Sequence, residues 1–592
     1  MCGVFAYIGH GDNAPEIVFE GLKLLEYRGY DSWGVAFIPK NEPKKIIFEK
    51  HTGKIGSASL KKSSASQIAF GHTRWATHGG VTDKNAHPHF DCKGRIAVIH
   101  NGIVENYHEL KEKLFSQGHV FKSETDTEVI GHMIEEKLKK TSLEKAVFET
   151  FKSLVGSNAV CILDLETETI VACRNGSPLV VGADNINHQY FLGSDVPAFL
   201  KYTNKVHFLS DNEAVEITKD GIILFDLKDE KEKKMSLQTL DWQIEDAEKG
   251  GYPHFLIKEI NEQKQTIVKT SVINEKELLK VANLINKGCK VVITGCGTAS
   301  YCALAGKYFL ANSGTESQIY GAYEFLPFTK FCDKKTVVIG ISQSGETADT
   351  LIALREAKKQ GAHIVAVINA RGSTMERLAD IVIPVGAGPE IAVVSTKAFT
   401  AQLATLYMLA KTVKGEYKKA KKEIAVLNQN LNSWLNDDLN NKLVKLAKSL
   451  YEKEHIYLIG KYLNYPAALE FALKIKETAY IHAEPFTAGE LKHGVITLIQ
   501  KGTPCFVLAS NDEVRNEVLS SAAELKARGA HIIGVAPFTS PEFDEVIKTP
   551  DLGELTIFGN IIVGQLLGYY LGIGRGTDPD KPRNLAKSVT VK

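Results

Sequence analysis

The 592-residue sequence has almost no net charge, with 71 basic and 70 acidic side chains and a formal charge of +1. A protein that binds nucleic acid or an anionic membrane through its overall charge carries a clear basic excess, so neither partner is indicated. The nine cysteines are scattered and form no CxxC pair, which argues against a disulfide framework and favours a reducing compartment. The opening MCGVFAYIGHGD lacks the basic start and long apolar run of a signal peptide. These absences predict a cytoplasmic protein.

One uncharged stretch is long enough to cross a bilayer, LTIFGNIIVGQLLGYYLGIG at residues 555–574. It contains Asn560 and Gln565, and the chain around it has the composition of a globular protein, 44% apolar and 24% charged. The sequence repeat described next places it at the end of a βαβ unit. We therefore expect a buried helix, with a membrane span as the weaker alternative.

The C-terminal half repeats itself at an offset of 168 residues, because GAHIVAVI at 361–368 returns as GAHIIGVA at 529–536. Short apolar runs rich in β-branched residues end in Gly or Ser and alternate with helical segments. This pattern is typical of parallel strands in doubly wound sheets. Each repeat closes with an apolar helix, at 400–411 and 562–573.

The first 225 residues have a different pattern. Runs such as RIAVIHNG and NAVCILDLE lie close together, often without room for a crossover helix, which predicts antiparallel sheets. The charge run KDEKEKK at 228–234 makes a natural boundary. We expect an α/β multidomain chain: a first domain at 2–225, a linker at 226–278, parallel-sheet domains at 279–419 and 446–576, and a tail at 577–592.

Cys2 stands directly behind Met1. Removal of Met1 would place a thiol and a free α-amine on adjacent carbons, and the amine, with a pKa of about 7.7–8.0, could act as base to the thiol. The run IAVIH ends in Asn101-Gly102, which offers an amide side chain and an unhindered N–H to an oxyanion hole. A hairpin turn is the commoner use of Asn-Gly.

Five further blocks support the catalytic interpretation: EYRGYDSWG, GHTRWATHG, AHPHF, HNGIVEN and SETDTE. Together with MCGVF, they resemble in order the glutamine amidotransferases with an N-terminal cysteine nucleophile, which implies an Ntn-hydrolase-like αββα sandwich and L-glutamine as substrate. In that resemblance Arg74 clamps the glutamine α-carboxylate, Asp126 binds its α-amine, and Trp75 is a channel gate at the inner edge of the pocket. The resemblance also implies that Cys2, Asn101 and Gly102 are catalytic, and that Thr77, His78 and His87 line the pocket.

Five histidines in this region raise the question of a metal: His72, His78, His87, His89 and His100. Their spacing fits no common zinc pattern, and no cysteine stands at ligand distance in the sequence. We expect most of them to form structural hydrogen bonds, and we expect no metal.

Hydroxyl residues gather at three expected helix starts in the first repeat: GCGTAS, SQSGET and Ser395-Thr396. Each alone is an ordinary N-cap, but three in one βαβ domain favour a phosphate site. The G-x-G in GCGTAS lacks the third glycine of a dinucleotide fingerprint. SQSGET in a duplicated unit resembles the sugar isomerase (SIS) domains, although Ala299 and Val394 depart from the family pattern. The resemblance implies phosphosugar binding by Thr298, Ser300, Ser342, Gln343, Ser344, Thr347 and Ser395.

The second repeat concentrates ionisable groups in ALKIKETAYIHAEPFTAGELKHG. Lys474 and Glu477 are three residues apart on one helix face, and the purely structural interpretation is a surface ion pair. The SIS resemblance implies instead that they are catalytic, with Glu477 moving a proton between sugar carbons C1 and C2. It further implies that His493 opens the sugar ring across a dimer interface, and that Lys587 of the tail PRNLAKSVTVK forms a Schiff base with the open-chain ketose.

The amidotransferase blocks, the two SIS repeats and the tail together resemble enzymes that aminate a ketose phosphate. The resemblance implies that a homodimer, without added cofactor, passes ammonia from glutamine to D-fructose 6-phosphate and forms glucosamine 6-phosphate. An amidotransferase acting on a diphosphosugar would need two adjacent Asp before a Gly-rich loop, and none follows an expected strand. A sensor that binds a phosphosugar without converting it would not need Cys2, Glu477 or Lys587, so their joint presence argues against this alternative.

Overall fold

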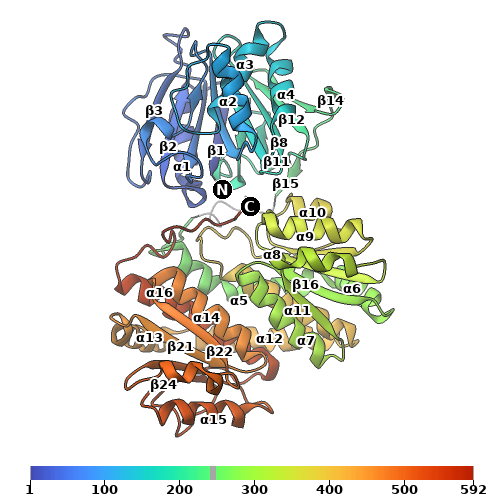
Figure 1. The fold of residues 1–592 in the computed structure, drawn as a ribbon, viewed down its shortest axis with the longest axis vertical. Coiled ribbons are helices and arrows are strands. Elements are labelled where there is room, and N and C mark those ends of the chain that lie inside the picture. The colour runs from blue at the N-terminus through green and yellow to red at the C-terminus, as the bar shows by residue number, and fades with distance from the viewer. Residues whose placement is uncertain (1, 241–247, 591–592) are drawn as a thin grey trace. The chain divides into compact units, whose positions relative to one another are not determined.

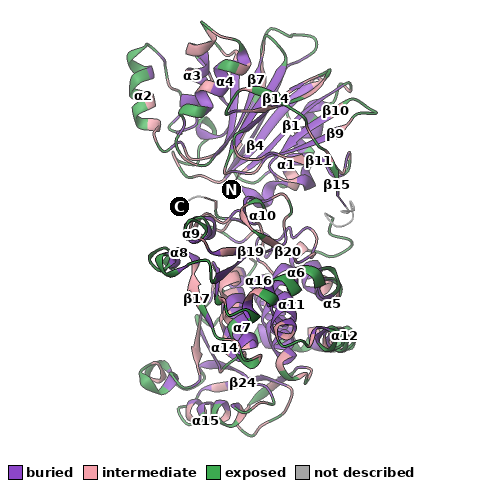
Figure 2. Cartoon of the chain, turned by 90° about the vertical axis from the view of Figure 1, so that its right-hand side faces the viewer, coloured by how far each residue is buried: buried purple, intermediate pink, exposed green. Residues whose placement is uncertain are grey.

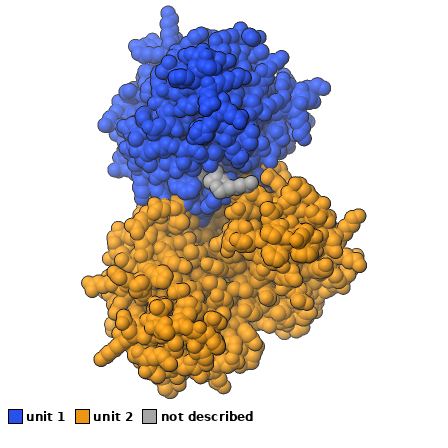
Figure 3. Space-filling model, viewed as in Figure 1, with its two compact units in different colours: residues 1–247, 372–374, 586–592 blue, residues 248–371, 375–585 orange. Residues whose placement is uncertain are grey.

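The computed structural model describes residues 2–240 and 248–590. They fall into two compact units, one of residues 1–247, 372–374 and 586–592 and one of residues 248–371 and 375–585 (Figure 3). The expected linker at 226–278 includes residues 241–247, which lie outside the described residues. So do Met1 and the last two residues of the expected tail.

The first unit contains two antiparallel sheets (Figure 1). The eight-stranded sheet has the order β15-β11-β9-β10-β1-β4-β2-β3, and the seven-stranded sheet the order β14-β13-β12-β8-β7-β6-β5. Their strands are β1 (Gly3–Gly9), β2 (Ser32–Phe37), β3 (Ile47–Thr52), β4 (Ile68–Arg74), β5 (His89–Phe90), β6 (Ile96–Gly102), β7 (Asn158–Asp164), β8 (Thr169–Asn175), β9 (Val180–Asp184), β10 (Gln189–Gly193), β11 (Lys205–Phe208), β12 (Glu213–Thr218), β13 (Gly221–Asp226), β14 (Lys231–Lys233) and β15 (Gln238–Thr239).

The two sheets pack face to face and helices cover their outer faces. Alternate residues of β1, such as Val4 and Ala6, share a buried cluster with Ala97 and Ile99 of β6, as the two-residue period of a strand requires. Helix α1 (Ala14–Leu24) packs on β1 and β4. Helices α3 (Glu128–Leu138) and α4 (Leu143–Ser153) join the core on the other side of the seven-stranded sheet, while α2 (Tyr107–Ser116) packs against α3. The expected αββα sandwich is confirmed.

The second unit contains two five-stranded parallel sheets with the same topology, β17-β16-β18-β19-β20 and β22-β21-β23-β24-β25 (Figure 1). This confirms the sequence repeat and the doubly wound fold. The strands are β16 (Lys290–Gly295), β17 (Ser317–Gly321), β18 (Thr336–Ser342), β19 (His363–Ile368), β20 (Ile381–Pro384), β21 (His455–Gly460), β22 (His482–Thr487), β23 (Pro504–Leu508), β24 (His531–Ala536) and β25 (Glu545–Lys548). The principal helices are α5 (Phe255–Ile273), α6 (Glu275–Asn286), α7 (Thr298–Asn312), α9 (Ala348–Lys359), α11 (Lys397–Val413), α12 (Tyr417–Trp434), α13 (Asp437–Leu450), α14 (Asn464–Ala479), α15 (Arg515–Lys526) and α16 (Thr556–Gly574).

The uncharged stretch forms α16, which is buried against α14 (Figure 2). Residues 553–574 form the single helix in the described part of the chain that is long and apolar enough to span a membrane, and 83% of its most apolar window is buried inside the protein. Its polar side chains find partners within the unit. Asn560 Nδ2 donates to Asn464 Oδ1 at 2.7 Å, and Gln565 Oε1 accepts from Gln263 Nε2 at 2.7 Å. The expectation of a buried helix is confirmed.

The described part of the tail, residues 577–590, contains no helix or strand. Its first part is nevertheless anchored to the second unit. The carboxylate of Asp580 accepts the free N–H groups of Phe255 and Leu256 at the start of α5, at 2.9 and 2.8 Å, which is how a helix N-terminus is normally satisfied. Further along, Arg583 N donates to the Tyr480 hydroxyl at 2.8 Å.

Candidate functional site

Cys2 precedes β1 in the first unit, where strand β4 and the end of β6 meet it. Its Sγ accepts a hydrogen bond from Trp75 N at 3.2 Å, and its carbonyl accepts one from Asn101 Nδ2 at 2.8 Å. Burial raises the pKa of the Cys2 thiol, while the Trp75 hydrogen bond and the Arg74 charge act in the opposite direction. The expected removal of Met1 concerns a residue outside the described part and stays a prediction.

Asn101 and Gly102 end β6 and are paired with Ala159 and Asn158 of β7, so the interpretation of Asn-Gly as a hairpin turn is wrong. Gly102 has φ +135°, and a Cβ there would lie 2.0 Å from the Ser157 carbonyl oxygen. Only glycine fits this position without a backbone shift. The two expected oxyanion residues thus lie on the strand whose Asn101 side chain contacts Cys2.

Gly102→Ala is expected to lower the free energy of unfolding of the first unit by at least about 2 kcal/mol, because the Ser157 carbonyl must move. Thermal unfolding of the full chain, followed together with glutamine hydrolysis, measures the effect. Gly94→Ala is the matched control, since Gly94 also has positive φ but a Cβ there meets nothing within 4 Å. Equal losses in the two variants would contradict the packing argument.

Arg74 and Asp126 are both buried, each 4% exposed. Arg74 ends β4, and its guanidinium donates to the carbonyls of His78, Gly79 and Gly80, the last two at 3.1 and 3.2 Å. Asp126 precedes α3 and accepts from Val104 N at 2.7 Å. Burial lowers the pKa of the Arg74 guanidinium, whereas the charges of Cys2 and Asp126 raise it. The Arg74 guanidinium therefore lies close enough to the Asp126 carboxylate and the Cys2 thiol for their charges to interact.

Most of the histidines form hydrogen bonds inside the sandwich, as expected. His87 stacks on His72 with ring centroids 4.1 Å apart, and its Nδ1 accepts from His100 N at 3.2 Å. Burial lowers the pKa of His72 to about 3 and that of His87 well below its ordinary value, so both rings are neutral. On the 75–80 loop, His78 is half-buried and Thr77 is exposed.

The SQSGET loop runs from Ser342, the last residue of β18, to Thr347, the N-cap of α9. Ser342 Oγ accepts from Gly345 N at 2.9 Å and lies 3.2 Å from Thr347 Oγ1, while Ser344 Oγ accepts from Glu346 N at 3.2 Å. Gln343, next to Ser342, is half-buried. The loop lies at the carboxyl end of a parallel strand, where doubly wound sheets bind their ligands.

The other hydroxyl clusters begin α7 and precede α11. Thr298 is the first residue of α7, and Ser395 stands two residues before α11. Ser395 Oγ donates to Glu390 Oε2 at 3.0 Å. Ser300 Oγ donates to the Gly297 carbonyl at 2.7 Å, so this hydroxyl is engaged by its own loop.

Lys474 of α14 joins the two repeats. Its side chain is 1% exposed, and Nζ lies 2.7 Å from Glu477 Oε2 and 3.1 Å from Glu470 Oε1. The same Nζ donates to Thr298 Oγ1 at 3.3 Å and to the Ser395 carbonyl at 3.1 Å. The interpretation of Lys474 and Glu477 as a surface ion pair is therefore wrong for the lysine, which is buried between the repeats, while the Glu477 side chain keeps 17% exposure.

The sequence prediction missed Glu470, although it stands one helical turn before Lys474 on the same face of α14. Its side chain is fully buried, and burial raises its pKa to about 7 against the lowering effect of Lys474. Burial would lower the pKa of Lys474, but the two carboxylates raise it above the ordinary lysine value. The two carboxylates therefore favour the charged form of the lysine, while burial favours the protonated form of Glu470.

Two predicted catalytic residues lie outside this cluster. His493 is exposed at the end of a short helical turn at Leu491–His493. Lys587 is half-buried in the part of the tail that groups with the first unit. Their expected places beside the sugar remain predictions.

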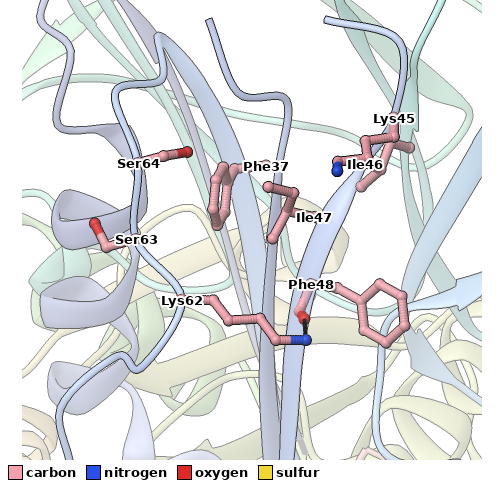
Figure 4. A pocket seen from close by; sticks show the side chains of 8 residues that line it. All are labelled: Phe37, Lys45, Ile46, Ile47, Phe48, Lys62, Ser63 and Ser64. Atoms are coloured by element: carbon pink, nitrogen blue, oxygen red, sulfur yellow. Dashed lines mark hydrogen bonds between the residues drawn. The ribbon is translucent and has the colours of Figure 1, made fainter. Parts of the chain in front are cut away.

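A surface pocket lies on the eight-stranded sheet beside its edge strand β3 (Figure 4). It is lined by Phe37, Lys45, Ile46, Ile47, Phe48, Lys62, Ser63 and Ser64, and Lys62 Nζ donates to the Phe48 carbonyl at 3.2 Å. None of these residues belongs to the predicted glutamine site, so we assign it no function.

Comparison with known proteins gives matches over both units. Residues 72–201 match the glutamine amidotransferase domain family, and residues 283–412 and 449–544 match the SIS domain family. The C-terminal domain of glucosamine-fructose-6-phosphate aminotransferase from Francisella tularensis is a similar solved structure, with a TM-score of 0.51 and 30% identity. The match covers 56% of this chain and 99% of that domain.

Several full-length relatives carry the same name, glutamine–fructose-6-phosphate aminotransferase (isomerizing). The chain is 44% identical to the protein of Clostridium tetani and 42% identical to those of Pyrococcus horikoshii and Aquifex aeolicus. Each comparison covers 100% of both proteins. The chain therefore belongs to the glutamine–fructose-6-phosphate aminotransferase (isomerizing) family.

Proposed function

We propose that the protein converts L-glutamine and D-fructose 6-phosphate into glutamate and glucosamine 6-phosphate, the first step of amino-sugar (UDP-N-acetylglucosamine) synthesis. It works as a cytoplasmic homodimer, needs no added cofactor, and passes ammonia from the first site to the second. The observation that carries the proposal is the Lys474–Glu477 pair, whose lysine is buried against Thr298 and the Ser395 carbonyl of the first repeat. In the same chain the Cys2 carbonyl accepts from Asn101, and the Cys2 thiol accepts from the Trp75 N–H.

At the first site, the α-amine of Cys2 takes the thiol proton and the thiolate attacks the glutamine amide carbon. Asn101 and the Gly102 N–H stabilise the oxyanion of the tetrahedral intermediate. The C–N bond breaks, the amine returns the proton to the leaving ammonia, and water hydrolyses the thioester to glutamate. Arg74 and Asp126 hold the two ends of the α-amino acid, Thr77, His78 and His87 line the pocket, and Trp75 gates the ammonia channel.

At the second site, the sugar phosphate is bound by hydroxyl, amide and backbone N–H groups at helix starts. His493 from a second copy of the chain opens the ring, and Lys587 condenses with the C2 carbonyl, releasing water. Ammonia displaces Lys587 to give the C2 imine, and Glu477 then carries a proton from C1 to C2. The phosphate ligands are Thr298, Ser300, Ser342, Gln343, Ser344, Thr347 and Ser395.

Purified protein given glutamine and fructose 6-phosphate, with nothing else added, is expected to produce glucosamine 6-phosphate and glutamate in equal amounts. Mass spectrometry of the products over time tests this. Glutamate without any amino sugar, or an absolute need for an added cofactor, would contradict the proposal.

We expect a fragment starting near residue 246 to fold and to convert fructose 6-phosphate into glucose 6-phosphate without glutamine. The expected cut, at residues 228–245, falls partly on residues outside the described part of the chain, and one compact unit begins at residue 248. A coupled glucose-6-phosphate assay measures the activity. A folded fragment that lacks it would place essential residues in the first unit.

Borohydride reduction in the presence of fructose 6-phosphate is expected to add one hexose phosphate at Lys587. A lysine this near a chain end is usually mobile and has no catalytic role. Selective labelling of Lys587 would therefore identify it as the residue that forms the Schiff base. Peptide mass mapping locates the adduct, with exposed Lys492 as an internal comparison. Labelling at another lysine, or full synthetic activity in Lys587→Ala, would reject this role.

A further inference from the structure

Four potential metal ligands converge in the first unit, away from the five histidines weighed in the sequence. Cys92 lies in the turn after β5, His119 follows α2, and His132 and Glu135 share one face of α3. One ligand atom from each lies within 4.8 Å of the others. His119, His132 and Glu135 are buried, and Cys92 is exposed.

Five of the six distances between the ligand atoms of this cluster are close to those of a tetrahedral site. Cys92 Sγ lies 3.5 Å from Nδ1 of His119 and 3.5 Å from Nδ1 of His132, and the two Nδ1 atoms are 3.2 Å apart. Glu135 Oε2 is 3.3 and 3.7 Å from the same two nitrogens. A tetrahedral zinc ion with Zn–S of about 2.3 Å and Zn–N of about 2.0–2.1 Å separates S from N by about 3.5 Å and N from N by about 3.3 Å.

A carboxylate lies behind each ring, at hydrogen-bond distance for His119 and at ion-pair distance for His132. His119 Nε2 lies 2.9 Å from Glu136 Oε1, and His132 Nε2 lies 3.7 Å from Glu128 Oε1. The bond to Glu136 places the proton of His119 on Nε2 and leaves its Nδ1 as a lone-pair donor. That lone pair faces His132 Nδ1 at 3.2 Å and the carboxylate oxygen Glu135 Oε2 at 3.3 Å, so groups able to donate electron pairs converge on one point.

We propose that Cys92, His119, His132 and Glu135 bind one zinc ion in a closed, structural site. One thiolate, two imidazoles and one carboxylate are ligands that zinc accepts, and four protein ligands leave no open position for a reacting water. Glu136 fixes the orientation of the His119 ring, and the Glu128 carboxylate lies behind the His132 ring.

The zinc ion would fasten both ends of the segment between His119 and His132. That segment carries Asp126, to which we assign the glutamine α-amine, so this consequence rests on the proposed function. The ligands come from three separate stretches of chain, with β6 and α2 between Cys92 and His119. No short motif reveals such a site, which is why the sequence alone predicted no metal.

Elemental analysis of the tag-free full chain after dialysis against metal-free buffer is expected to give about one zinc per chain. A variant with Cys92→Ser and His132→Ala should lose it, whereas the matched controls Cys289→Ser and His10→Ala should keep it. A zinc content that is unchanged in the double variant would overturn the proposal.

A cobalt titration keeps the test decisive if the double variant does not fold. Chelator-treated wild-type protein, shown to be folded by circular dichroism, should bind about one Co²⁺ with a thiolate-to-cobalt charge-transfer band. A zinc-free wild type that develops no such band would also overturn the proposal. Neither readout uses glutamine or a sugar, so failure here is distinct from failure of the proposed function.

Discussion

Cys2→Ala is expected to lower glutamine hydrolysis by roughly 10³-fold or more, the scale on which hydrolases lose activity when their nucleophile is removed. The physical reason is that no other group takes over its bond-forming step. The half-buried Cys2 has its Sγ held by Trp75 N and its carbonyl held by Asn101, and an alanine methyl group at this position cannot attack an amide. Fructose 6-phosphate binding should survive, because the phosphate loops belong to the other compact unit.

Glutaminase assays and calorimetric titration with fructose 6-phosphate separate these two effects. Cys289→Ala is the matched control, since Cys289 is a half-buried thiol of the second unit. Intact-mass analysis of the wild type should show that Met1 has been removed. Active enzyme that retains Met1, or a Cys2→Ala variant that still hydrolyses glutamine, would refute the assignment of the nucleophile.

Glu477→Gln is expected to lower the isomerisation of fructose 6-phosphate by about 10²–10⁴-fold, the contribution of a positioned general base. The amide keeps the size of the side chain but cannot carry a proton from C1 to C2. Lys474 stays paired with Glu470 at 3.1 Å, so the lysine keeps a charged partner and the unit should remain folded.

The Glu477 variant is compared with Glu452→Gln, because Glu452 is an exposed glutamate two residues after the end of α13. Isomerase rates, thermal unfolding and glutamine hydrolysis are measured for both. Loss of the isomerase rate with unfolding and hydrolysis unchanged supports the role in proton transfer. An isomerase rate close to the wild-type value would assign the proton shuttle to another group, with Glu470 the next to test.

Local patterns in the sequence predicted the fold well because each acts over a few residues. The β-branched runs became parallel strands such as β18, and the uncharged stretch became α16, whose Asn560 and Gln565 are paired inside the unit. The structure of the dipeptide Asn101-Gly102 was harder to predict from the sequence. Its commonest use is a turn, and only the pairing of β6 with β7 shows that both residues belong to a strand.

Contacts between distant segments could not be predicted in the same way. The sequence shows that Lys474 and Glu477 share a helix face, but not that this face is buried against Thr298 and the Ser395 carbonyl. Glu470 could have been found from its helical spacing. The Cys92 cluster could not, because its geometry depends on how a turn, a loop and a helix pack around one point.

We expect the amide nitrogen of glutamine to become the amino nitrogen of the sugar without mixing with bulk ammonia. Glutamine labelled with ¹⁵N in its amide is supplied with fructose 6-phosphate and an excess of unlabelled ammonium, and the glucosamine 6-phosphate is analysed by mass spectrometry. We expect the product to be predominantly ¹⁵N-labelled. A product whose label is diluted to that of the bulk ammonium would contradict it.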